Sequence, residues 1–158
     1  MFCQVDPPAG YHRVMGMGIL LRVLVAAGLA ADAVVHWRFA PDMAPGPNTP
    51  SDVIPGDDLF RGQAIAAAVA ALLVLFWARR WTYAIAFVVA ASAAGAVLLY
   101  YFVDFGQLGP IPRMYDPQWY ADKTISFAGE AVAALAALIG FFTVGRKEKA
   151  ESYSSAVR

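Results

Sequence analysis

The chain has 158 residues, of which 59% are hydrophobic and only 15% charged, and its formal net charge at pH 7 is zero. Soluble domains are closer to half apolar and a quarter charged, so this composition excludes a disordered chain and argues against a soluble domain. Without net charge, the chain also lacks a general electrostatic attraction to nucleic acid. A single cysteine excludes an internal disulfide, and two histidines are too few for a histidine-rich metal cluster.

Four segments of the sequence are apolar over the length of a transmembrane helix, which needs about 20 predominantly apolar residues. They are rich in Ala and Leu and lack the alternation of strands, so helices are favoured over a closed β-barrel. We therefore predict an all-α integral membrane protein, a single-domain bundle of four transmembrane helices. The predicted helices are residues 14–38, 59–78, 81–104 and 123–145.

The first apolar segment also has features of a cleaved signal peptide, because Arg13 precedes it and small residues stand near its end. Against cleavage, Arg22 interrupts the apolar run, and the stretch before the segment is long and contains prolines. We expect a retained helix in which the Arg22 side chain extends toward the nearby headgroups. Met15 and Met17 are alternative translation starts.

Lys and Arg are divided unequally between the two sides of the predicted bundle, and cytoplasmic segments carry the excess of such residues. One side has seven of them: Arg13, Arg79, Arg80, Arg146, Lys147, Lys149 and Arg158. The other side has four: Arg38, Arg61, Arg113 and Lys123. We therefore expect a multi-pass protein of the cell membrane with both termini cytoplasmic. Residues 39–58 and 105–122 become two extended extracytoplasmic loops, and 146–158 becomes a frayed, polar cytoplasmic tail.

The two extracytoplasmic loops are rich in proline and aromatic residues and are longer than a simple helix connection requires. Such loops on one side of a small bundle indicate a recognition surface or a lid. The candidates for recognition are the aromatic residues Trp37, Tyr115, Trp119 and Tyr120. The alternative is that the loops only cover the outer end of the bundle.

Three ionisable residues lie inside the predicted helices near their outer ends. Asp32 and His36 are four residues apart and share one helix face, and Glu130 lies about 9 Å below the outer end of its helix. If the first and fourth helices are neighbours, these side chains converge beneath the loops, near the level of Arg38, Arg61, Gln63, Ser126 and Lys123. Asp, His and Glu together can bind a divalent metal ion or relay protons.

The structural alternative is that these residues hold helices together, with Asp32 paired with His36 or Arg61 and Glu130 paired with Arg61 or Lys123. Ser126, three residues after Lys123, is interpreted as part of the start of the fourth helix.

Small residues at a spacing of four, such as Gly28 with Asp32 and Gly129 with Ala133, permit close approach of helices. We expect them to pack this chain's own helices; the alternative is a homo-oligomer or docking to a larger membrane complex.

The sequence contains no nucleotide-binding loop and no HExxH or GxSxG motif, and it requires no cofactor, so we expect binding rather than catalysis. The first hypothesis is a binding or accessory subunit that recognises a partner complex, a lipid or a hydrophobic small molecule at its outer face. The alternative is a proton- or metal-handling, transporter-like protein that uses Asp32, His36 and Glu130. A weaker alternative is a quinone-linked membrane redox subunit. Membrane lipids are expected partners, and nucleic acid is not.

Overall fold

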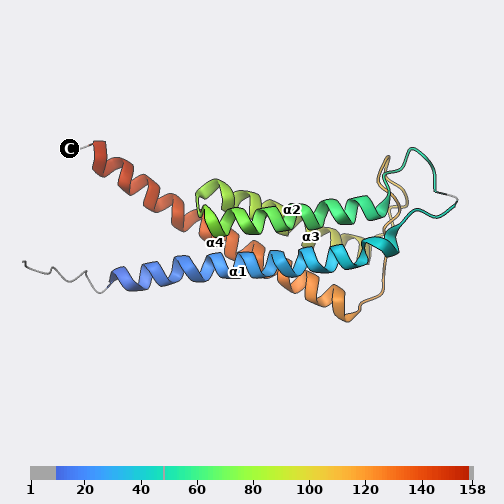
Figure 1. The fold of residues 1–158 in the computed structure, drawn as a ribbon, viewed down its shortest axis with the longest axis horizontal. Helices are drawn as coiled ribbons and strands as arrows, with labels where there is room; N and C mark the ends of the chain where they lie inside the picture. Colours follow the sequence, from blue (N-terminus) through green and yellow to red (C-terminus); the bar gives the residue numbers. More distant parts are fainter. Residues whose placement is uncertain (1–9, 48, 157–158) are drawn as a thin grey trace, which may run out of the picture.

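The computed structural model describes residues 10–47 and 49–156, and it confirms a bundle of four helices (Figure 1). The helices are α1 (Gly10–Phe39), α2 (Gly56–Phe76), α3 (Arg80–Phe102) and α4 (Ala121–Ala156), and a short 3-10 helix, η1 (Ala40–Met43), follows α1. The described residues form no β-sheet; a single isolated bridge joins Leu108 and Ile111.

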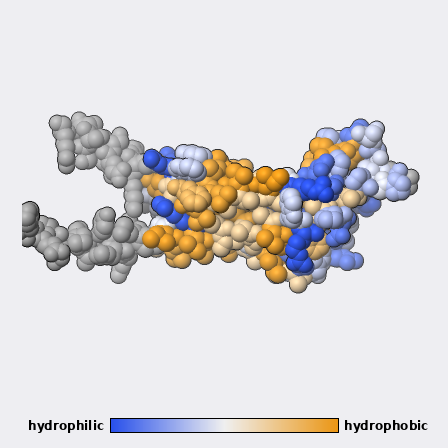
Figure 2. Space-filling model, in the orientation of Figure 1, coloured by the Kyte–Doolittle hydropathy of each residue, from blue (hydrophilic) through white to orange (hydrophobic). Residues whose placement is uncertain are grey.

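Each helix contains a segment long and apolar enough to cross a membrane, and together the four segments define a multi-pass membrane protein. These segments are Met17–Met43, which runs on into η1, and Gly56–Phe76, Arg80–Phe102 and Ala121–Val144. Figure 2 shows the corresponding surface: on the face in view, the middle of the bundle is predominantly apolar, and hydrophilic residues gather at the end that carries the long loops. An exposed apolar band of this kind is stable only against lipid or another apolar surface.

The helices pack in a fixed order, with α1 between α2 and α4, and with α3 against α4 and, less extensively, α2. The core between them consists mainly of alanine, so the helix axes approach closely. Gly28 of α1 and Gly129 of α4 mark the tightest place, because a Cβ atom on Gly129 would lie only 3.0 Å from the Gly28 carbonyl oxygen. Gly28 and Gly129 therefore pack two of the chain's own helices against each other.

The two long connections, residues 40–55 and 103–120, lie together at one end of the bundle, which we call the loop end (Figure 1). Their backbones meet where the Ile54 N–H donates a 2.8 Å hydrogen bond to the Pro110 carbonyl. The second connection is also tied to α3, because the Asp116 N–H donates to the carbonyl of Tyr100 at 3.1 Å. The two loops are thus hydrogen-bonded to each other, and the second loop is hydrogen-bonded to α3.

The opposite end, which we call the tail end, holds the short α2–α3 connection and the extension of α4 (Figure 1). The expectation of a frayed tail over 146–158 is wrong for the described part, since α4 continues to Ala156. This stretch lacks proline and contains several good helix formers. Extending an existing helix avoids the costly nucleation step, so the polar residues simply prolong α4. Residues 157–158 lie outside the described residues.

Candidate functional site

Asp32 and His36 of α1 and Glu130 of α4 form a compact cluster near the loop end. Each residue offers one ligand atom, and these atoms all lie within 4.8 Å of one another. Asp32 and Glu130 are completely buried, whereas the His36 side chain keeps 15% of its surface exposed. The sequence places Asp32 and His36 on one helix face, and the packing of α1 against α4 brings Glu130 to them.

The close crossing of α1 and α4 explains why the two acids meet. Gly28 lies one helical turn before Asp32, and Gly129 directly precedes Glu130. Because neither glycine has a side chain, the two backbones come into contact there. The carboxylates on either side of this contact are therefore buried in the same small space.

Asp32 is held by neighbours from two helices. Its Oδ2 accepts a 2.9 Å hydrogen bond from Nε2 of Gln63 on α2. Its Oδ1 lies 2.5 Å from Nδ1 of His36, and the Asp32 carbonyl oxygen lies 3.1 Å from the same nitrogen. Gln63, a sequence candidate, therefore belongs to the site and extends it to α2.

Glu130 has one hydrogen-bond donor beside it. Its Oε1 accepts a 2.7 Å hydrogen bond from the Ser126 hydroxyl, one helical turn earlier on α4. Its other oxygen, Oε2, is buried and has no hydrogen-bond partner among the residues that the structure describes. A buried carboxylate oxygen without a donor is costly, which marks a position where a further ligand would be stabilising.

Ser126 is the site residue that sequence reasoning misassigned. We interpreted it as part of the start of the fourth helix, but it is 3% exposed and bonded to Glu130. The available signal was its spacing of four residues from Glu130, which places both side chains on one helix face.

Basic side chains near the loop end are engaged elsewhere. Arg61 lies 2.8 Å from Asp57 and 3.4 Å from Asp58 on its own helix, so the structure does not bring this sequence candidate to the cluster. Lys123 lies 2.8 Å from Asp116. In the described structure Arg61 and Lys123 therefore do not neutralise the two buried acids. The other part of the structural alternative, Asp32 paired with His36, is present at 2.5 Å.

The aromatic candidates in the loops have different environments. Trp37 is 58% exposed on α1, and Tyr115 is also exposed. Trp119 packs edge-on against Tyr101 and donates a 2.8 Å hydrogen bond to Thr124. Tyr120 packs near Phe39 of α1, with ring centroids 5.9 Å apart. These contacts indicate that Trp119 and Tyr120 fasten the second loop to the bundle.

Lys123 provides the strongest attachment of that loop. Its ammonium group donates to the Asp116 carboxylate at 2.8 Å and to the backbone carbonyls of Asp116 and Gln118 at 2.9 and 2.7 Å. The Tyr120 ring centroid lies 5.0 Å away, within cation–π range. Partial burial raises the pKa of Asp116, but the hydrogen bonds from Lys123 and the Gln118 backbone outweigh it, so the pKa lies below its usual value.

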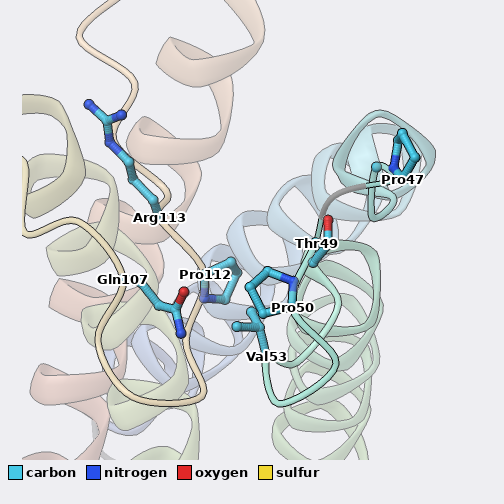
Figure 3. A pocket seen from close by; sticks show the side chains of 8 residues that line it. Pro47, Thr49, Pro50, Val53, Gln107, Pro112 and Arg113 are labelled. Atoms are coloured by element: carbon cyan, nitrogen blue, oxygen red, sulfur yellow. The ribbon is translucent and has the colours of Figure 1, made fainter.

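A separate cavity of about 430 Å³ lies between the two loops (Figure 3). Prolines and small polar residues line most of it: Gly46, Pro47, Thr49, Pro50, Val53, Gln107 and Pro112, with Arg113 at its edge. Figure 3 shows the Arg113 side chain extending away from the other labelled residues, and its guanidinium is paired with Asp104. No residue of the Asp32–His36–Glu130 cluster lines this cavity, so the two features are distinct.

The fold and the cluster define the class: a multi-pass helical membrane protein with a buried Asp–His–Glu group at one end of the bundle. No family model, curated protein or solved structure matches the chain.

Proposed function

We propose that this protein binds a divalent transition-metal cation between α1 and α4, with Asp32, His36 and Glu130 as ligands. The observation that carries the proposal is the convergence of three ligand atoms within 4.8 Å. Zinc binds nitrogen and oxygen ligands at about 2.0–2.2 Å in tetrahedral geometry, so ligand atoms around one ion lie about 3.3–3.6 Å apart. Ligand atoms that lie as much as 4.8 Å apart must therefore approach one another by about 1 Å when they bind an ion.

The charge of the cluster supports a cation. As metal ligands, the two carboxylates and a neutral imidazole together carry two negative charges, because ligands bind in their deprotonated forms. The described Lys and Arg side chains near the cluster pair with other acids. A dication between the carboxylates compensates the charge and gives Glu130 Oε2 a partner.

The donor types favour particular ions. Imidazole suits zinc, iron, nickel and copper, and carboxylates suit manganese as well as zinc, whereas magnesium and calcium prefer sites made of oxygen alone. We therefore choose Zn²⁺ and Mn²⁺ as probes. Gln63 and Ser126 orient the ligands without binding the metal: Gln63 donates a hydrogen bond to the Asp32 carboxylate, and Ser126 donates one to the Glu130 carboxylate.

The experiment is equilibrium metal binding to the purified protein in detergent, followed by metal analysis. We expect one Zn²⁺ or Mn²⁺ per chain, and roughly a tenfold or greater loss of affinity in the isosteric variants Asp32→Asn and Glu130→Gln. Asp58→Asn is the matched control, because Asp58 lies at the same end but outside the cluster, on α2, and is 60% exposed on its side chain. Absence of stoichiometric binding, or equal affinity in Glu130→Gln, overturns the proposal.

We also propose that the loop end faces the outside of the cell membrane and that both termini are cytoplasmic. The support is the excess of Lys and Arg at the tail end in the sequence. A reporter enzyme active only outside the cytoplasm, fused after Arg158, should be inactive, and an active fusion contradicts this orientation.

The hypotheses of an accessory subunit and of a quinone-linked redox subunit stay predictions from the sequence. The geometry favours the cation hypothesis over both, because it supplies a specific donor set rather than only an apolar surface.

A further inference from the structure

Polar side chains on α4 lead from the loop end to the buried cluster. Asp122, Ser126 and Glu130 follow one another at intervals of four residues and lie on one face of the helix. Their exposure decreases along this series: the Asp122 side chain is 33% exposed, Ser126 3% and Glu130 0%. We call these three residues the polar track.

On α1, side-chain exposure also decreases from the loop end toward the cluster. The Arg38 side chain is 66% exposed, that of His36 15%, and Asp32 is completely buried. The two helices are joined at the exposed end of the track, where the Arg38 guanidinium lies 3.6 Å from the Asp122 carboxylate. An ion pair this exposed contributes little stability, so it can open readily.

On the side of the cluster that faces the tail end, the core is apolar. Leu29 lies one helical turn closer to the tail end than Asp32, as Ala67 does relative to Gln63 and Ala133 relative to Glu130. The side chains of Leu29, Ala67 and Ala133 are completely buried. The contact between Gly28 and Gly129 closes the remaining space between α1 and α4.

The next buried side chains with polar atoms toward the tail end, within the described part of the chain, are Thr82 and Tyr83 at the start of α3. The Thr82 hydroxyl already donates to the Trp77 carbonyl at 2.7 Å. A cation moving in that direction would leave its ligands for a layer without polar side chains, which is strongly unfavourable.

We propose that the cation reaches and leaves the cluster only through the loop end, along the polar track, and that the Arg38–Asp122 pair controls its rate of passage. This inference rests on the proposed cation site. It makes the protein a one-sided receptor for the cation rather than a route across the membrane.

The rate-controlling pair is tested by stopped-flow loading and release of Zn²⁺ in detergent. Arg38→Gln breaks the Arg38–Asp122 pair that lies across the exposed end of the track. We expect both rates to rise roughly two- to fivefold, with an unchanged ratio and therefore unchanged affinity, as suits an exposed ion pair. Arg61→Gln is the matched control, since it removes the same charge from the same end but away from the track. Unchanged rates in Arg38→Gln, or an equal rise in Arg61→Gln, overturn this part.

The direction of access is tested with Zn²⁺-loaded protein in sealed liposomes. A tag fused after Arg158 allows capture of the liposomes in which the tail end faces outward. A membrane-impermeant chelator outside should remove zinc from the uncaptured pool, while the captured pool keeps its zinc until detergent opens the liposomes. Equal removal from both pools contradicts one-sided access. If the protein holds no zinc even before reconstitution, the proposed cation site itself is wrong.

Discussion

Gly28 and Gly129 lie in backbone contact where α1 crosses α4, since a Cβ atom on Gly129 would be 3.0 Å from the Gly28 carbonyl oxygen and 3.3 Å from Ala31 Cβ. This contact explains how two helices far apart in the sequence bury Asp32 and Glu130 in one place. The stability of the crossing and the geometry of the cluster are therefore coupled.

The first prediction concerns that crossing. Gly28→Ala would place a methyl group against the Gly129 carbonyl and 2.9 Å from Ala133 Cβ, so the helices must separate. Overpacking of this kind costs about 1–3 kcal/mol, and we expect a lower thermal midpoint together with weaker Zn²⁺ binding. Gly18→Ala is the control on the same helix, because nothing lies within 4 Å of its added Cβ. Similar midpoints for the two variants would show that the crossing is not tight.

The second prediction concerns the orientation of Glu130. Ser126→Ala removes the 2.7 Å hydrogen bond to Oε1 and leaves the carboxylate free to rotate. Groups that orient metal ligands contribute roughly 10- to 100-fold to affinity, so we expect Zn²⁺ affinity to fall by that range. Ser92→Ala is the control, since Ser92 is exposed and bonds only to Val89 of its own helix. Unchanged affinity in Ser126→Ala would restrict Ser126 to a packing role.

The third prediction concerns the attachment of the second loop. Lys123→Met keeps most of the apolar side chain but removes three hydrogen bonds to Asp116 and Gln118. We expect faster trypsin cleavage after Arg113, because hydrogen bonds from a charged donor contribute about 1.5–3 kcal/mol each. Arg61→Met, a basic residue of α2 that bonds only within its helix, should leave the cleavage rate unchanged. Equal cleavage in wild type and Lys123→Met would show that other contacts hold the loop.

The fourth prediction concerns acid pH. The hydrogen bond from Arg113, helped by that from the Gly106 backbone, lowers the pKa of Asp104 from its usual value of 3.8. Because the pKa of Asp104 is lowered in the folded state, its pairing with Arg113 stabilises the loop fully at pH values above 3.8. This stabilisation is lost as the pH falls through the lowered pKa. Carboxyl ¹³C shifts recorded against pH should place the Asp104 midpoint below 3.8, and Arg113→Gln should raise it toward that value. A midpoint at or above 3.8 in the wild type contradicts the pairing.

Much of the fold follows from the sequence, because length and hydropathy determine membrane helices almost alone. The ends of α2 and α3 agree with the sequence prediction to within a few residues, Gly56–Phe76 against 59–78 and Arg80–Phe102 against 81–104. The main departure is α4, where a helix already begun continues through polar residues that carry no apolar signal.

The candidate site was only half predictable. Asp32 and His36 are four residues apart in sequence, so helix geometry alone places them together. Their meeting with Glu130 depends on which helices are neighbours, and hydropathy contains no such information. The position of Arg61 could not be predicted from hydropathy either. Its side chain pairs with Asp57 and Asp58, four and three residues earlier on α2, and not with the cluster.

The most direct test of the central claim is X-ray absorption spectroscopy of the Zn²⁺-loaded protein. Asp32, His36 and Glu130 as ligands predict one imidazole nitrogen and otherwise oxygen neighbours, at about 2.0–2.2 Å. Two imidazoles or a sulfur neighbour would place the metal at His12 or Cys3 instead. Either result, or a protein that retains no zinc, contradicts a cation site between α1 and α4.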